Sequence, residues 1–268
     1  SEMCIRDRSL SHGDGIGVKR NIQILLEYDG SNYHGWQRQE NALTVQEKVE
    51  EAIEQITKED IRLIGSSRTD SGVHARGQSA NFYTGSKIPI EKIPYALNSK
   101  LPIDIRIYQA IERPMGFHSC YDAIGKKYTY HIQNSAFHSA LEYNRAWHIP
   151  QKLSIENMRK ANEFLIGTHD FSAFRASGSL IKTSIRTITS SKLIRKDKKI
   201  ILEIQGNGFL YHMVRIIMGT LVEVGMGKIS YEEIMDIIKS KDRSRAGITA
   251  PAHGLYLEKV FYESMGNH

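Results

Sequence analysis

The sequence has little of what marks a secreted or membrane-bound protein. It contains only two cysteines, Cys4 and Cys120, among 268 residues, and these cannot make the disulfide framework of a small secreted domain. No apolar run approaches the roughly 20 residues that a helix needs to cross a bilayer. No secretory leader is recognisable. We therefore expect a cytoplasmic protein without a membrane partner.

Several common ligand-binding motifs are also missing. The 11 histidines include no H-E-x-x-H pattern, and no cysteine–histidine pair has the spacing of zinc ligands. There is neither a Walker A pattern nor a G-x-G-x-x-G motif after a strand. We expect no metal and no cofactor.

Charge of neither sign dominates the chain. Lysine and arginine number 36 against 30 aspartates and glutamates, which gives a net charge of +6. This modest excess is compatible with a polyanionic partner but does not require one. With 40% apolar residues, the chain can bury the core of one large domain or of two small ones.

The most informative stretch is Gly65–Gln78, GSSRTDSGVHARGQ. It follows an apolar run at 61–64 and precedes an alternating one, so it is predicted to be a polar turn between two strands. Arg68 and Asp70 project from the same face of an extended backbone, where the arginine stabilises the ionised carboxylate. Taken alone, D-S-G is also common in ordinary surface turns.

The remaining pattern predicts an α+β fold. Alternating residues indicate strands at 21–28, 61–64, 104–111, 128–133, 185–194 and 199–205. Helical spacing and capping residues indicate helices at 44–56, 154–166, 208–225 and 231–240. We expect the helices to cover one face of a sheet.

Two segments have the mixture of residues found at RNA interfaces. The loop at 28–39, YDGSNYHGWQRQ, combines aromatics with an arginine, and we expect it to face RNA. Lys126 and Lys127 stand beside Tyr128, as expected where a base stacks while its phosphates are held. A strand with an aromatic core face would explain Tyr128 equally well. Arg215 is the only cation in 208–225 and needs a partner, so it is a candidate for a cleft.

Four motifs together resemble the TruA family of tRNA pseudouridine synthases. S-R-T-D-S-G-V-H-A resembles the family signature G-R-T-D-A-G-V-H, and the 28–39 loop resembles Y-D-G-x-x-Y-x-G-W-Q-x-Q. F-H-S-C…K-K-Y-T-Y resembles F-H-A-R…R-R-Y-R-Y, and the closing G-L-Y-L is similar to the family's ending. The motifs follow the family's order from about residue 21 to residue 262. Cys120 replaces an arginine and two lysines replace two arginines, which removes the planar guanidinium fork there.

The resemblance implies a pseudouridine synthase-like α+β fold. It would consist of two related halves with an antiparallel sheet, helices on one face and an RNA-binding cleft between the halves. Residues 1–19 would be a disordered or extraneous leader. Residues 20–125 would form the half that carries the catalytic aspartate, and 126–268 the half that completes the uracil pocket.

The resemblance also implies an activity and a set of site residues. The family isomerises uridine to pseudouridine in the anticodon stem-loop of tRNA, here at positions 38–40, as a homodimer and without a cofactor. Asp70 would be the catalytic carboxylate, with Arg68 beside it, and Tyr128 and Leu255 would pack on the uracil. The expected phosphate contacts are Arg175, Arg215, Lys126 and Lys127. Two alternatives stay open: a non-catalytic RNA-binding module of the same fold, and a hydrolase that acts on nucleosides through Asp70.

Overall fold

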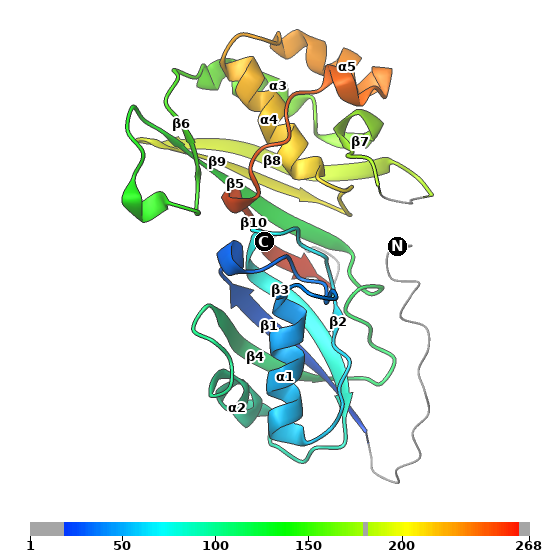
Figure 1. The fold of residues 1–268 in the computed structure, drawn as a ribbon. Coiled ribbons are helices and arrows are strands. Elements are labelled where there is room, and N and C mark those ends of the chain that lie inside the picture. The colour runs from blue at the N-terminus through cyan, green and yellow to red at the C-terminus, as the bar shows by residue number, and fades with distance from the viewer. Residues whose placement is uncertain (1–18, 179–181, 263–268) are drawn as a thin grey trace. The chain divides into compact units, whose positions relative to one another are not determined.

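The computed structural model describes residues 19–178 and 182–262, which form two compact units (Figure 1). The first unit takes the described residues up to Ala123 and those from Leu257 onward, and the second is Ile124–Tyr256. All but the last residue of the expected leader lies outside the described residues. The chain therefore changes unit close to residue 125, but it returns to the first unit at its end.

The first unit is built on a sheet with helices on one face (Figure 1). Its strands follow the order β4–β1–β3–β10, and β2 pairs with β3. The strands are β1 (Arg20–Tyr28), β2 (Ile64–Gly65), β3 (His74–Thr84), β4 (Ile105–Arg113) and, from Leu257 onward, β10 (Leu255–Phe261), whose residues Leu255 and Tyr256 belong to the second unit. The helices are α1 (Val45–Thr57) and α2 (Ile93–Asn98). β1 pairs antiparallel with both β3 and β4, as predicted for this fold.

The residues of α1 explain both its start and its packing. The Thr44 hydroxyl accepts a hydrogen bond from the Glu47 backbone N–H at 3.4 Å, so a polar side chain caps the first turn. The apolar stripe of the helix is buried, as the spacing predicted; it comprises Val45, Val49, Ala52 and Ile53. Lys58 ends the helix in the left-handed conformation.

The opposite face of the first sheet is polar but buried. The Asn81 amide donates to Asn21 Oδ1 at 2.9 Å, and Asn21 Nδ2 donates to the carbonyl of Phe117 at 2.8 Å. Ser119 N–H donates to Asn81 Oδ1 at 2.9 Å, and the Tyr262 hydroxyl donates to the carbonyl of Ser119 at 2.8 Å. These bonds fasten the segment after β4 onto the sheet.

The described residues of the second unit contain five strands and three helices. Its strands follow the order β5–β9–β8–β7, and β6 runs parallel beside β5. The strands are β5 (Gly125–Asn134), β6 (Trp147–Ile149), β7 (Gly167–Asp170), β8 (Ile185–Lys196) and β9 (Lys199–Gly206). The helices are α3 (Ile155–Glu163), α4 (Met213–Gly225) and α5 (Ile234–Ser240). No helix in the described parts of the chain is long and apolar enough to cross a membrane.

Two predicted elements are shorter in the structure than the sequence pattern suggested. The strand predicted at 61–64 is reduced to Ile64–Gly65, because α1 side chains bind the Leu63 backbone: Leu63 N–H donates to Glu50 and the Leu63 carbonyl accepts from Gln46, both at 3.0 Å. The helix predicted from Gly208 begins only at Met213, because His212 has a left-handed backbone with φ of 59°. Burial of α4 almost all round is confirmed.

Candidate active site

The turn that carries Asp70 lies between β2 and β3 and is held by the loop that follows β1. Trp36 N–H donates to the Thr69 carbonyl at 3.1 Å on one side of Asp70. On the other side, Gly72 N–H and the Ser71 hydroxyl both donate to the Tyr33 carbonyl, each at 3.3 Å. The backbone is therefore fixed on both sides of Asp70.

A buried side-chain contact adds to this support. The hydroxyls of Tyr28 and Thr69 lie 2.7 Å apart, and both residues are buried. Val73 N–H donates to the Asp70 carbonyl at 3.1 Å, and Gly72 takes a positive φ of 79°, a conformation that glycine adopts without strain. Asp70 itself is half-buried and Arg68 is exposed, which places the carboxylate at the boundary with solvent.

Glycine is required where the loop touches the turn. Gly35 has a φ of 91°, and a Cβ atom there would lie 2.5 Å from the Thr69 carbonyl oxygen. A Cβ on Gly30 would collide with the Val73 carbonyl. Both glycines of the Y-D-G-S-N-Y-H-G-W segment therefore let two backbones approach more closely than side chains would allow.

The aromatic residues of this loop pack inside the first unit. Tyr33 and Trp36 are 4% and 2% exposed, so these two rings are packed in the core and are not available to stack on RNA bases. The Tyr33 hydroxyl donates to Asp104 at 2.6 Å. Burial, and next its hydrogen bond to Asp104, raise the pKa of Tyr33. The loop is a support for the Asp70 turn.

In the second unit, β5 separates the two adjacent lysines. Tyr128 is buried, and its ring meets the Phe209 ring edge-on at 5.2 Å. Because successive strand residues point to opposite faces, Lys126 shares the face of Tyr128 and Lys127 lies on the other. The two cations expected to act together beside Tyr128 are thus on different faces of the sheet.

Lys126 lies near another cation, Arg186, in the second unit. It sits opposite Gly206 in the β5–β9 pairing. Burial, and next the charge of Arg186, lower the pKa of Lys126 to about 8. Arg186 and Phe209 were not identified from the sequence, because β8 and the segment before α4 are distant from Lys126 along the chain. The only local sign was the pair of glycines beside an aromatic in G-N-G-F.

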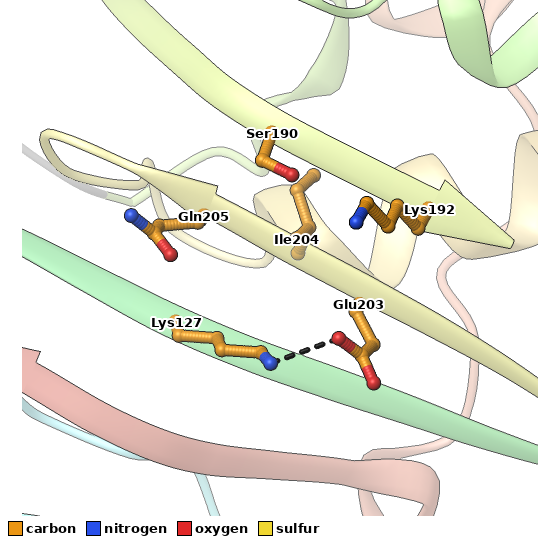
Figure 2. A pocket seen from close by; sticks show the side chains of 6 residues that line it. All are labelled: Lys127, Ser190, Lys192, Glu203, Ile204 and Gln205. Atoms are coloured by element: carbon orange, nitrogen blue, oxygen red, sulfur yellow. Dashed lines mark hydrogen bonds and ion pairs between the residues drawn. The ribbon is translucent and has the colours of Figure 1, made fainter. Parts of the chain in front are cut away.

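Lys127 lines a separate cavity on the other face of strands β5, β9 and β8. Its ammonium lies 2.8 Å from a carboxylate oxygen of Glu203. Figure 2 shows this ion pair between neighbouring strands, with Lys192 beyond it on β8. The cavity has a volume of about 200 Å³ and is lined by Lys127, Ser190, Lys192, Glu203, Ile204 and Gln205.

The other expected site residues also lie in the second unit. Arg175 is half-buried and directly follows a short 3₁₀ turn, Ser172–Phe174. Arg215 is on the first turn of α4, and its Nε donates to the Ala250 carbonyl at 2.8 Å. Leu255 opens β10 and is 7% exposed. The first unit thus holds Asp70 and Arg68, and the second holds the residues expected to contact base and phosphates.

The described residues contain no group of three or more histidine, cysteine, aspartate or glutamate side chains that could hold a metal ion.

Comparison with known proteins identifies the family. The family model described as tRNA pseudouridine synthase matches residues 24–122 and 161–263, which is well over half of the 268 residues.

The chain belongs to the tRNA pseudouridine synthase family. It is 57% identical over 243 residues to a tRNA pseudouridine synthase A of Acetivibrio thermocellus, a match that covers 91% of this chain and 100% of that protein. A tRNA pseudouridine synthase A of Thermoanaerobacter sp. is 56% identical with the same coverage. A tRNA pseudouridine synthase A 2 of Clostridium tetani is 51% identical over 247 residues, again 91% and 100% of the two chains.

As a member of this family the enzyme is an isomerase. The first matched segment begins at Ile24 within β1 and includes both the loop after β1 and the Asp70 turn. The second includes α4 and Leu255. Residues 123–160, with Lys126, Lys127 and Tyr128, lie between the matched segments. The residues expected to bind the base thus divide between matched and unmatched parts of the synthase.

Proposed function

We propose that this synthase converts uridines of the tRNA anticodon stem-loop to pseudouridine, with Asp70 as the catalytic carboxylate. The observation that carries the proposal is the Arg68-Thr69-Asp70 turn, which is braced on both sides of Asp70 by the glycine-containing loop. A carboxylate that must act at one sugar carbon needs such a fixed backbone, since misplacement by about 1 Å can cost 100-fold in rate.

The reaction breaks the N1–C1′ bond of the target uridine and joins C5 to C1′. N1 gains a proton and C5 loses one to water, so the isomerisation balances without a co-reactant. A uracil stacked in RNA must first be extruded, at a cost of a few kcal/mol. Arg68, which is exposed, would fill the vacated space. Asp70 would act at the sugar, either as a nucleophile at C1′ or as a base at C2′.

The second unit would bind the extruded base and its phosphates. Tyr128 and Leu255 would pack against the uracil, and Tyr128 could carry the proton at C5. Arg175, Arg215 and Lys126 would hold phosphates, together with Lys127 if the RNA reaches the other face of β5. We further propose a cytoplasmic homodimer in which one tRNA contacts both subunits. Light scattering that gives the free protein the molar mass of one chain, 30.5 kDa, would overturn the dimer.

Tritium release from [5-³H]uridine-labelled tRNA tests the proposed chemistry. We expect release by the parent, none by Asp70→Asn, and equal tRNA binding by both. Asp197→Asn is the matched control, because Asp197 is exposed in the β8–β9 turn and its positive φ of 53° suits asparagine. Binding without release by the parent would favour the non-catalytic RNA-binding module.

The position of the target is tested separately. We prepare transcripts in which one uridine of the anticodon stem-loop at a time is replaced by cytidine. Each replacement of a target uridine should reduce the tritium released per tRNA by the share that this uridine contributed. Full release from a transcript without uridine in the anticodon stem-loop would contradict the proposed specificity while leaving the proposed reaction intact.

A further inference from the structure

The segment that leads into Leu255, residues 246–254, is held at several points by side chains of α4 and β5. It lies along α4: Gly247 N–H donates to the Thr220 hydroxyl at 2.9 Å. A Cβ on Gly219 would collide with the carbonyl of Ile248. The segment and the helix are therefore in backbone contact, and small shifts of the segment along α4 are sterically restricted.

Two consecutive peptide carbonyls of this segment are then bound by side chains. Arg215 Nε donates to the Ala250 carbonyl at 2.8 Å, and Ala250 N–H donates back to the Arg215 carbonyl at 3.1 Å. The Tyr130 hydroxyl donates to the next carbonyl, that of Pro251, at 2.6 Å. These bonds fix the chain four and five residues before Leu255.

Tyr130 touches the segment a second time. A Cβ on Gly254 would lie 2.6 Å from the ring carbon that bears the Tyr130 hydroxyl, so the residue directly before Leu255 rests on this ring. Tyr130 is 0% exposed, and burial raises its pKa well above the usual value, with a smaller opposite effect of Arg215. The hydroxyl therefore stays protonated, and able to donate a hydrogen bond, at neutral pH.

We propose that Tyr130 is a positioning residue that sets the place of Leu255 against the target uracil. The inference rests on the proposed function, in which Leu255 and Tyr128 pack on the base. Tyr128 and Tyr130 lie two apart on the same face of β5, so one rigid strand supplies the aromatic packed on the base and the support for the leucine. The distance between the two walls of the pocket is then determined by β5.

The Tyr130→Phe variant tests this role, because it removes one hydroxyl and keeps the ring under Gly254. Tyr256→Phe is the matched control: its hydroxyl donates to the Arg145 carbonyl of the same unit at 2.8 Å. In steady-state tritium release we expect Tyr130→Phe to lower kcat about tenfold, because a displaced leucine misorients the reacting base. KM for tRNA should stay within about twofold, because phosphate contacts dominate affinity. Tyr256→Phe should change neither.

Coupling to Leu255 separates positioning from a general loss of stability. If Tyr130 acts through Leu255, the double variant Tyr130→Phe, Leu255→Ala should be no slower than Leu255→Ala alone, since contacting residues give non-additive effects. If the double variant instead shows a loss in kcat equal to the product of the two single losses, the proposal is overturned. An unchanged kcat in Tyr130→Phe would also overturn it.

A second variant covers the case in which Tyr130→Phe does not fold. Thr220→Val removes the hydroxyl that binds Gly247 and keeps the side-chain volume, and the same drop in kcat at constant KM is expected. A parental KM and kcat in folded Thr220→Val would then overturn the role. No release by the parent would overturn the proposed function and this role together, whereas release by the parent with full kcat in Tyr130→Phe would overturn the role alone.

Discussion

The charge of Lys126 depends on its surroundings in the second unit. Its pKa is lowered from 10.5 to about 8 by burial and by Arg186. The folded protein therefore releases this proton at lower pH than the unfolded chain does. The stability cost of the buried charge is fully present below pH 8 and declines as pH rises from about 8 to 10.5.

This shift predicts a pH dependence of tRNA binding. If Lys126 holds a phosphate, the affinity for tRNA should fall as pH rises through about 8, because the amine loses its charge. Lys126→Arg should remove this fall, since a guanidinium stays charged. Lys126→Gln should lower affinity at neutral pH and reduce the slope of log affinity against log salt by about 0.7–0.9.

Filter binding across this pH range measures the effect. Lys198→Gln is a suitable control, because Lys198 is exposed in the β8–β9 turn and should leave both the salt slope and the pH profile unchanged. An identical pH profile in Lys126→Arg and the parent would show that Lys126 does not contact the phosphates.

The buried hydroxyl of Ser119 lowers the stability of the fold. Its hydroxyl is buried without a hydrogen-bond partner in the described structure, a state that costs roughly 1–3 kcal/mol. The family motif F-H-A has alanine at this place. Ser119→Ala should therefore raise the free energy of unfolding by about 0.5–1 kcal/mol, measured by urea denaturation.

Ser66 is a second buried serine, and unlike Ser119 its hydroxyl has a hydrogen-bond partner. The Ser66 hydroxyl is also buried but donates to Gln78 Oε1 at 2.8 Å, so Ser66→Ala should lower stability by about 1 kcal/mol. Equal destabilisation by both variants would mean that the Ser119 hydroxyl has a favourable contact after all.

At the scale of elements, the loop after β1 determines whether the Asp70 turn keeps its shape. Gly35→Ala would introduce a Cβ 2.5 Å from the Thr69 carbonyl oxygen at a φ of 91°. We expect a loss of about 1–3 kcal/mol in stability and of roughly 100-fold in single-turnover rate. Gly116→Ala is the control, since a Cβ there meets nothing within 4 Å. Full activity in folded Gly35→Ala would disprove the bracing role of the loop.

The elements that the sequence predicted well are those determined by local pattern. Alternation located β1 and the β8–β9 hairpin, and a threonine cap with an apolar stripe located α1. The start of α4 was missed because it depends on a distant contact: Ala176 N–H donates to the Tyr211 carbonyl at 3.1 Å, in the stretch just before the left-handed His212. No window of neighbouring residues contains that information.

In the candidate site, too, the sequence located the residues that form a local motif but not those that only tertiary packing brings together. The Asp70 turn was recognisable because its chemistry lies in consecutive residues. The burial of Trp36 beneath that turn and the effect of Arg186 on Lys126 were not, since each joins elements that only tertiary packing brings together. Strand alternation alone places Lys126 and Lys127 on opposite faces, but we grouped them as two cations beside Tyr128 and did not apply it.

At the scale of the whole molecule, the two units differ in continuity. The second unit is one stretch, Ile124–Tyr256, whereas the first also needs residues from Leu257 onward. Arg76 pairs with Glu258 at 2.6 Å, and a Cβ on Gly77 would collide with the Glu258 carbonyl. The last strand is thus packed closely against β3.

This difference predicts how fragments behave. A fragment of residues 124–256 should unfold cooperatively in urea, because this one stretch contains strands β5 to β9 and helices α3 to α5. A fragment of residues 19–123 should not, because it lacks β10 and the Tyr262 hydroxyl that binds Ser119. Circular dichroism through a urea titration measures both, and a cooperative transition in the shorter fragment would contradict the expectation.

The return of the chain to its first unit also has a consequence during synthesis on the ribosome. At roughly 5–20 residues per second, translation of the second unit delays the last strand by on the order of 10 seconds. The stretch bearing Asp70 emerges early but stays without β10 until residues 255–261 have been synthesised. The second unit can fold first, and the part of the enzyme that holds its proposed catalyst is completed last.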